Sequence, residues 1–447
     1  MRGLRSTIAL IVVLGGLAAY IYFVTWKQAP EESFRAEKVF ASLQGDKIDE
    51  LRVKSSAGET TTLKKASGGW LVEEPVKAAA DETTASGITS NLASVEVVRV
   101  VDENPADLKV YGLATPRVEI AFKAAGDKEY QQLQIGDKAP TGGNTFAKLG
   151  NAKRVFLIGA YPEGEFDKST FDLRDKTVVK FDRDKVDGVE VRNGGTTTIE
   201  LSKRDGDWRI TKPISALADF GSVEGLIGRL QTAQMKSIVT IDPTTADLKK
   251  YSLDKADRTI TVGIGSAHAT LLFGDRADDA AVYARDASKP MVVTVETSLA
   301  DDLVKGTDDY RRKDIFTFRP YNADHLEITR NGQTVVLDRI KAPDENVADT
   351  WRRVSPTKKD VDKDDMNSVL SKLSIMRATS FVDSTTNTGV DKPEMSVAVK
   401  FEGKEERVTF GRAGDAAYAS RPGDPGAAKL DSTDFGEALK AIDALAK

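Results

Sequence analysis

The sequence contains no cysteine and only two histidines among its 447 residues. Without cysteine the chain cannot form disulfides, a cysteine-ligated zinc site, an iron–sulfur cluster or a thiol nucleophile. The two histidines, His268 and His325, have no histidine or triad partner near them in sequence, so little remains for metal binding or acid–base chemistry. Excess positive charge is also missing, because 64 basic residues face 69 acidic ones. This balance excludes a strongly basic nucleic-acid binder.

Nucleotide-binding and catalytic motifs are missing as well. The glycine-rich stretch 136–143 lacks the Gly-Lys-Ser/Thr end of a phosphate-binding loop. Ser252 and Lys255 fit a Ser-x-x-Lys pattern, but the matching position in an earlier repeat is Gly112, which indicates a loop. Segment 360–367 begins like a calcium-binding loop, yet its central glycine and closing glutamate are absent. We therefore predict a protein that is not an enzyme and that has no cofactor and no metal site.

What remains is the composition of an ordinary globular protein, with 40% hydrophobic and 30% charged residues. At roughly 150 residues per domain, the length predicts about three domains. The single long apolar run covers residues 6–26, which carry no charge. About 20 helical residues span the ~30 Å hydrocarbon core of a bilayer. We therefore predict one transmembrane anchor within residues 1–30.

Charge next to the apolar run predicts its orientation. Arg2 and Arg5 precede the run, which favours a cytoplasmic N-terminus and a body on the far side of the membrane. The alternative is a cleaved signal peptide, because small residues near Ala19 suit cleavage. The run continues to Val24, however, beyond the usual signal length of about 7–15 apolar residues. Both interpretations export the body.

One pattern occurs three times after the anchor, at intervals of about 140 residues. A tryptophan is followed five residues later by a proline and eleven residues later by an aspartate. The nine residues are Trp70, Pro75, Asp81, Trp208, Pro213, Asp219, Trp351, Pro356 and Asp362. We interpret them as structural anchors of a repeat, with the tryptophans in the core. The alternative is that the tryptophan faces stack on sugar rings.

Further matches follow in order in the first two copies. They are a Tyr-x-Leu segment (111–113 and 251–253), a Gly-Asp pair (136–137 and 274–275) and a closing segment (173–176 and 310–313). The third copy is looser, with Thr-Gly-Val at 388–390, and it ends near Lys447 without a closing segment. We therefore predict an anchor at 1–30 and three repeat modules. These modules are 31–182, 183–320 and 321–447, the last one truncated.

Each module has the same expected secondary structure. Alternating apolar and polar residues, as in 48–53 and 60–64, are typical of half-buried strands. The tryptophan segment is a third strand, and a helix with an aspartate N-cap follows it. More strands come next, with the Gly-Asp pairs as hairpin turns. The predicted fold class is α+β: three tandem sheet-and-helix repeat modules after one N-terminal transmembrane helix.

These features resemble a known bacterial family. The apolar anchor, the repeated Trp-x-x-x-x-Pro segments, the Tyr-Gly-Leu at 111–113 and the Gly-Asp at 136–137 resemble domain of unknown function 4340 (DUF4340), over nearly the whole chain after residue 40. Members are often encoded beside ABC-transporter components of the gliding-motility auxiliary type. The resemblance implies an envelope protein of the bacterial inner membrane that works with such a transporter. It carries over no catalytic residues.

We therefore expect a non-enzymatic, single-pass protein whose body lies in the periplasm. It would serve as an accessory or scaffold subunit of an inner-membrane ABC transport complex. Its expected partners are the membrane, an ABC permease with its ATPase or other envelope proteins, and not nucleic acid. One alternative is a periplasmic glycan- or lipid-binding module that uses grooves between the repeats. A third, with the least support, is an envelope hydrolase built on carboxylates.

Overall fold

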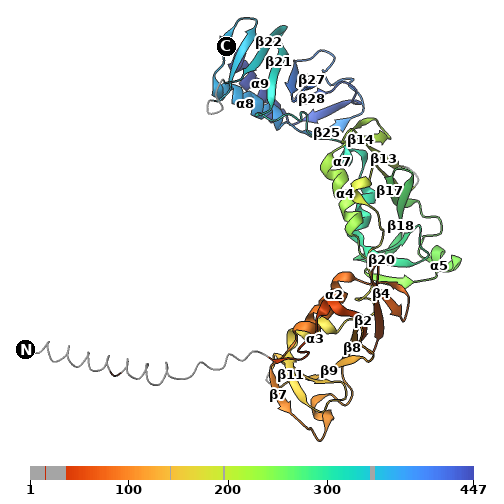
Figure 1. The fold of residues 1–447 in the computed structure, drawn as a ribbon. Helices are drawn as coiled ribbons and strands as arrows, with labels where there is room; N and C mark the ends of the chain where they lie inside the picture. The colour runs from red at the N-terminus through yellow and green to blue at the C-terminus, as the bar shows by residue number, and fades with distance from the viewer. Residues whose placement is uncertain (1–15, 17–36, 141, 195–196, 343–347, 447) are drawn as a thin grey trace, which may run out of the picture. The chain divides into compact units, whose positions relative to one another are not determined.

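The computed structural model describes residues 16, 37–140, 142–194, 197–342 and 348–446 (Figure 1). The chain divides into two compact units, Met1–Lys176 and Thr177–Lys447. The predicted anchor lies outside the described residues except for Gly16. In the part that is described, no helix is both long enough and apolar enough to cross a membrane.

The first unit contains one nine-stranded antiparallel sheet. Its strands, in order across the sheet, are β5 (Ala78–Ala79), β4 (Gly69–Glu74), β3 (Thr60–Ala66), β2 (Ile48–Lys54), β8 (Val118–Ala124), β9 (Gln131–Lys138), β10 (Asn144–Leu149), β11 (Val155–Gly159) and β7 (Arg99–Asp102). The helices are η2 (Gly45–Lys47), α2 (Glu82–Ser94), η3 (Leu108–Tyr111) and α3 (Ala160–Phe166). A separate two-stranded sheet joins β1 (Glu37–Lys38) to β6 (Glu96–Val97).

The second unit contains two more nine-stranded antiparallel sheets. The strands of the first are β15 (Ala216–Leu217), β14 (Asp207–Lys212), β13 (Thr197–Arg204), β12 (Gly188–Asn193), β17 (Arg258–Ile264), β18 (Ala267–Asp278), β19 (Ala281–Asp286), β20 (Val292–Glu296) and β16 (Ser237–Thr240). Its helices are η4 (Arg183–Lys185), α4 (Phe220–Thr232), α5 (Thr245–Lys250), α6 (Thr297–Ala300), η5 (Asp301–Val304) and α7 (Thr307–Tyr310).

The strands of the other sheet in this unit are β24 (Lys359–Asp360), β23 (Thr350–Ser355), β22 (Gln333–Ile340), β21 (Ala323–Arg330), β26 (Met395–Phe401), β27 (Lys404–Ala413), β28 (Ala416–Ser420), β29 (Ala427–Leu430) and β25 (Ala378–Val382). Its helices are α8 (Lys363–Ser374) and α9 (Ser432–Ala446).

All three sheets have the same strand order and the same place for the helix that follows the tryptophan strand. This confirms three sheet-and-helix modules, built mostly of β-sheet. The alternating pattern explains the packing: in β8, Val118, Ile120 and Phe122 point to one face and are fully buried. Helix α2 contributes Ile88 and Leu92 to the same core. Each fully buried aliphatic or aromatic side chain contributes about 1.5–3 kcal/mol.

The third module has all nine strands in its sheet. It differs from the other two after its last strand, where the 15-residue helix α9 takes the place of short helices and a closing segment. The module boundaries also lie a few residues earlier than predicted. The first compact unit ends at Lys176, and Ile315, Phe316 and Phe318 already belong to the core of the third module.

The Gly-Asp pairs lie inside strands and not in the hairpin turns that the sequence suggested. Gly136 is in β9 and Gly274 is in β18. A Cβ at either position would come closer than 3.0 Å to the tyrosine carbonyl oxygen of the upstream Tyr-x-Leu segment. Gly411 in β27 faces the backbone of Gly389 equally closely. The glycines are therefore needed because a connecting segment crosses directly over the strand.

Candidate functional site

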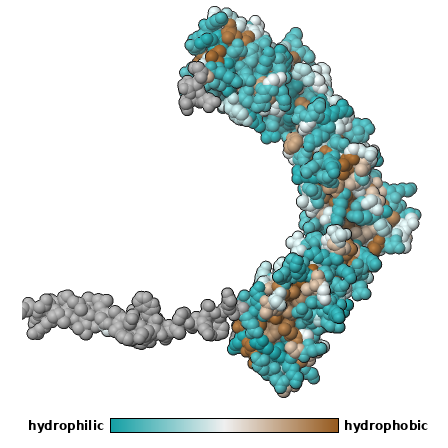
Figure 2. All heavy atoms as spheres, viewed as in Figure 1, coloured by the Kyte–Doolittle hydropathy of each residue, from teal (hydrophilic) through white to brown (hydrophobic). Residues whose placement is uncertain are grey.

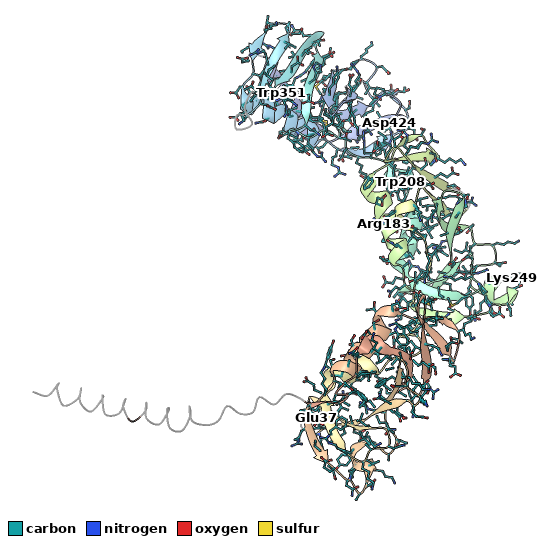
Figure 3. The ribbon with its side chains drawn as sticks, in the orientation of Figure 1. Glu37, Arg183, Trp208, Lys249, Trp351 and Asp424 are labelled. Carbon is teal, nitrogen blue, oxygen red and sulfur yellow. The ribbon has the colours of Figure 1, made fainter. Side chains whose placement is uncertain are left out.

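The tryptophans of the repeat lie in the cores of their modules. Trp70, Trp208 and Trp351 are 3%, 1% and 9% exposed, on strands β4, β14 and β23. Figure 3 labels Trp208 and Trp351. The residue opposite each tryptophan on the neighbouring strand is a cation. These cations are Lys65, Lys203 and Arg339. The peptide bonds before Pro75, Pro213 and Pro356 are all cis.

The three aspartates of the repeat are helix N-caps. Asp81, Asp219 and Asp362 each accept a hydrogen bond from the backbone N–H three residues on, at 2.7, 2.7 and 3.1 Å. The carboxylate satisfies a free N–H group and meets the positive end of the helix dipole. These residues therefore stabilise α2, α4 and α8, and their carboxylates are already bonded locally.

The structure does not bring the candidate catalytic residues together. Ser252 sits in a turn with φ of 58° and donates a hydrogen bond of 2.7 Å to Asp275. His268 lies on the same strand as Asp275 but seven residues away, a distance of about 23 Å along the strand. His325 belongs to the third module, where its Nδ1 lies 2.6 Å from Oδ1 of Asp338. Among the residues that the structure describes, no three His, Cys, Asp or Glu side chains are grouped to hold a metal ion.

The closing segment of the first module covers the outer edge of its sheet. The N–H of Asp81 donates to the carbonyl oxygen of Leu173 at 2.9 Å, and the N–H of Asp175 donates to the carbonyl oxygen of Ala79, also at 2.9 Å. Segment 173–176 therefore continues the sheet beyond β5 as a short antiparallel partner. Between the two bonds lies the bridge pair Ala80–Arg174.

The closing segment of the second module, 310–313, repeats this contact. The N–H of Asp219 donates to the carbonyl oxygen of Tyr310 at 2.7 Å, and the N–H of Arg312 donates to that of Leu217 at 3.0 Å. The bridge pair here is Ala218–Arg311. At the outer edge of each of these two sheets, the closing segment therefore places a large apolar residue followed by an arginine, in the same register.

The residues after each closing segment bond to the next module instead. The N–H groups of Val178 and Ile315 donate to carbonyl oxygens just after α4 and α8, at 3.1 and 3.0 Å. The N–H of Val39 makes the same bond after α2, at 2.9 Å. The residues just before these three form antiparallel pairs, namely Lys38–Glu96, Thr177–Gln234 and Asp314–Arg377. The connectors at 173–178 and 310–315 therefore each have one half for the preceding module and one half for the following one.

The connector between the second and third modules is held by buried charge. Arg311 is 3% exposed, its guanidinium carbon lies 4.0 Å from the ring centroid of Phe381, and it donates to the carbonyl oxygen of Pro425 at 2.6 Å. Burial lowers the pKa of Arg311, and the nearby carboxylate of Asp424 opposes that shift. Asp424 is itself paired with Arg421 at 2.8 Å. Arginine stays charged despite such a shift. Arg311 is therefore a buried cation that is held between the ring of Phe381, the carbonyl oxygen of Pro425 and the nearby carboxylate of Asp424.

A second pair on this connector involves Arg312 and Glu406 on β27. Burial is the main cause that lowers the pKa of Arg312, and the positive charge of Arg421 lowers it further. Glu406 lies 3.7 Å from Arg312 and also accepts hydrogen bonds from the N–H and the hydroxyl of Thr317, at 2.8 and 2.7 Å. The joint therefore combines backbone pairing, buried cations and a carboxylate that fixes the chain as it enters the third module.

Two hollows on the surface each belong to a single module. One of about 410 Å³ is lined by Trp351, the 75%-exposed Tyr321, Arg339 and Val361. Another, of about 390 Å³, lies beside Arg229 and the ends of α4 and β20. The face seen in Figure 2 is mostly hydrophilic, with scattered hydrophobic patches.

The sequence predicted the connectors between modules only in part. The similarity of 173–176 to 310–313 is a sequence signal, but its role is not, because a short extended segment carries no periodicity. The first connector was missed altogether. Aligning residues 34–40 with 173–179 and 310–316 would have found it, since each has a large apolar residue, then an arginine, then a β-branched residue four positions on.

Comparison with known proteins identifies one family. The sequence model described as domain of unknown function (DUF4340) matches residues 70–209 and 208–393, and both segments begin at a repeat tryptophan. No curated protein matches the chain. Two crystal structures of the DNA polymerase sliding clamp from Pseudomonas aeruginosa, one with ligand, align with 88% and 86% of this chain and 93% and 90% of theirs. Their identities of 8% and 9% and TM-scores of 0.17 and 0.18 carry no argument.

Proposed function

The chain belongs to the DUF4340 family, and from this premise we propose that it is a membrane-anchored periplasmic scaffold, an accessory subunit of an inner-membrane ABC transport complex. The uncharged run at 6–26 supplies the anchor, and Arg2 and Arg5 direct the body outward. Three modules with the same strand order then supply contact surface along the chain.

The observation that carries this proposal is the joint at Arg311. A flexible tether would need no buried contacts, yet this connector is bonded to β15 on one side and stacks its arginine on Phe381 on the other. Ordering a connector costs conformational entropy, which its contacts must offset. A defined geometry between the second and third modules suits a scaffold that presents surfaces in fixed register.

Crosslinking in cells, followed by affinity purification and mass spectrometry, tests the accessory role. We expect an ABC permease and its ATPase to be captured with the full-length protein. An alkaline phosphatase fused after residue 40 should be active if the body is periplasmic. Replacing Ser252 or His268 by alanine should leave transport-linked function intact, because the two side chains are not brought together.

Three results would contradict parts of this proposal. Recovery of the protein alone at native expression with several crosslinkers would oppose an accessory subunit. Loss of function in a stably folded Ser252→Ala or His268→Ala variant would favour an enzyme. A soluble form with its N-terminus near Ala19 would replace the anchor by a cleaved signal.

A second candidate function is glycan binding at the hollow beside Trp351. Its support is the exposed ring of Tyr321 next to Arg339 in a hollow of about 410 Å³. Aromatic faces and arginine are suitable contacts for sugar rings and their hydroxyls. Calorimetric titration with cell-wall glycan fragments tests it. Binding that is lost in Tyr321→Ala and kept in Tyr161→Ala, an equally exposed tyrosine, would support this candidate.

A further inference from the structure

The first module exposes two large apolar side chains at one end of its sheet (Figure 1). Val98 is 55% exposed and lies between β6 and β7, where its N–H donates to the carbonyl oxygen of Leu157 on β11 at 2.8 Å. Tyr161 is 75% exposed and is the second residue of α3, which begins directly after β11. Because β7 runs antiparallel to β11, Val98 lies beside the end of β11, and both side chains therefore lie where β11 leads into α3.

The other two modules have the same strand order and provide an internal comparison. Val98 lies two positions after the bridged Glu96, so its counterparts lie two positions after the bridged Gln234 and Arg377. The counterparts of Tyr161 are the second residues of α6 and α9. These four counterparts, all polar and all exposed, are Lys236, Thr379, Ser298 and Thr433. Every module therefore exposes both places to solvent, but only the first fills them with apolar side chains.

The chain enters the first module at this same end of the sheet. Glu37 of β1 pairs with Val97, the residue before Val98. Ten residues, 27–36, separate Glu37 from Trp26, the last residue of the uncharged run. Ten residues reach at most about 35 Å when fully extended. An anchor that ends at Trp26 therefore holds the apolar pair within this distance of the bilayer surface, and such tethering raises its effective concentration there.

We propose that Val98 and Tyr161 insert into the headgroup region of the bilayer that holds the anchor, and so fix this end of the first module against the membrane. An amphipathic tyrosine ring prefers that region, with its apolar body among lipid and its hydroxyl near water. Valine gains by leaving water for the acyl boundary. This inference rests on the membrane anchor of the proposed function, and it does not depend on the transporter partner.

The charges around the apolar pair are balanced, so the contact does not require anionic lipid. Arg154 forms an ion pair with Glu37 at 2.9 Å and lies 3.5 Å from Glu103. Lys38 lies opposite Glu96 in the register of β1 and β6. Salt screens exposed charges but not the burial of apolar surface. The contact should therefore form on zwitterionic lipid and persist at high ionic strength.

The absence of cysteine from the chain allows a test with single labelled sites. Full-length Val98→Cys and Tyr161→Cys proteins are labelled with the environment-sensitive dye NBD and reconstituted into phosphatidylcholine nanodiscs. The controls are Val110→Cys, at a 68%-exposed site in η3 of the same module, and Lys236→Cys, at the counterpart of Val98. A lipid with a nitroxide on its headgroup quenches dyes that lie at the bilayer surface. We expect quenching about threefold stronger at 98 and 161 than at 110 and 236, and unchanged between about 0.05 and 0.5 M NaCl.

A second variant removes the apolar pair and keeps the fold. Val98→Thr with Tyr161→Thr introduces the threonines that the third module has at these places, and both sites are exposed, so thermal melts should be unchanged. The dye is placed at Ser94→Cys, an exposed site at the end of α2. Its quenching should fall about threefold in the double variant. The matched control, Lys236→Thr with Ser298→Thr in the second module, should leave it unchanged.

Alkaline carbonate extraction of the same proteins from liposomes tests the anchor separately. Protein that stays with the lipid but is quenched equally at all four sites would overturn this inference and leave the anchor intact. Protein that is extracted would overturn both, because nothing would hold the pair at the bilayer. Quenching at 98 and 161 in native membranes, but not in discs that contain only lipid, would assign the pair to a partner protein and reject the membrane contact.

Discussion

The indole Nε1–H of Trp208 donates a hydrogen bond of 3.0 Å to Oε1 of Glu224 on α4. The ammonium of Lys203 lies 3.3 Å from the same oxygen and 5.5 Å from the centroid of the indole ring. The tryptophan strand and the helix are therefore tied together by one carboxylate. The other modules have Ser86 and Asn367 at this helix position, so the tie is particular to the second module.

Acid should weaken this tie. Burial acts to raise the pKa of Glu224, but hydrogen bonds from Trp208, Arg183 and Lys203 together lower it below its ordinary value. A carboxylate with a lowered folded-state pKa stabilises the fold above its unfolded pKa of about 4.3, and this contribution is lost as the pH falls through the folded value. Glu224→Gln should therefore cost about 1–2 kcal/mol at pH 7 and progressively less below pH about 4. Urea unfolding of the full chain in detergent, followed by tryptophan fluorescence, measures the difference. Exposed Glu296→Gln is the control, and a penalty that persists unchanged in acid would contradict this account.

Trp208 should matter for stability. Truncating a buried tryptophan to alanine costs about 3–5 kcal/mol through lost burial and a cavity. Trp208→Ala should therefore lower the unfolding midpoint of the second module strongly, and Trp208→Phe should lower it less. Tyr321→Ala, at a site 75% exposed, should change stability by less than about 0.5 kcal/mol. An unchanged melt for Trp208→Ala would show that this side chain is not a core anchor.

The aspartate caps should act as hydrogen-bond acceptors. Asp219→Ala should destabilise the protein by about 1 kcal/mol, because it frees the N–H of Ser222. Asp219→Asn should retain most of the stability, since asparagine is also a good N-cap. Hydrogen exchange in the first turn of α4 measures the effect locally. If asparagine were as poor as alanine, charge at the helix dipole and not the hydrogen bond would be the main contribution.

Replacing glycine by alanine, which adds one methyl group, should have opposite effects on stability at Gly274 and Gly87. Gly274→Ala places a Cβ within 3.0 Å of the Tyr251 carbonyl oxygen, so either the connecting segment or β18 must shift. We expect a loss of about 1–3 kcal/mol. Gly87→Ala in α2 meets no atom within 4 Å and should gain about 0.5–1 kcal/mol from helix propensity. Paired thermal melts compare the two, and a neutral Gly274→Ala would exclude the close crossing.

Local patterns predicted local structure well. The strands expected at 48–53 and 60–64 are confirmed as β2 and β3. The Gly-Asp pairs were predicted wrongly because glycine marks both turns and close backbone crossings, and only the packed strand shows which applies. The candidate site was predicted less well, since residues 173–176 and 310–313 were seen as similar but had no assigned role.

The sequence by itself determined that this protein is a tandem repeat, with a tryptophan strand and an aspartate-capped helix in each of three modules. Those features depend on residues within about a dozen positions of one another, so periodicity and spacing reveal them. Tertiary structure alone decided that β2 pairs with β8 and that the third sheet has all nine strands in the same order as the other two. These outcomes depend on backbone hydrogen bonds between segments far apart in the chain. Every non-proline residue carries the same backbone donor and acceptor, so such pairing leaves no signature in the residue types.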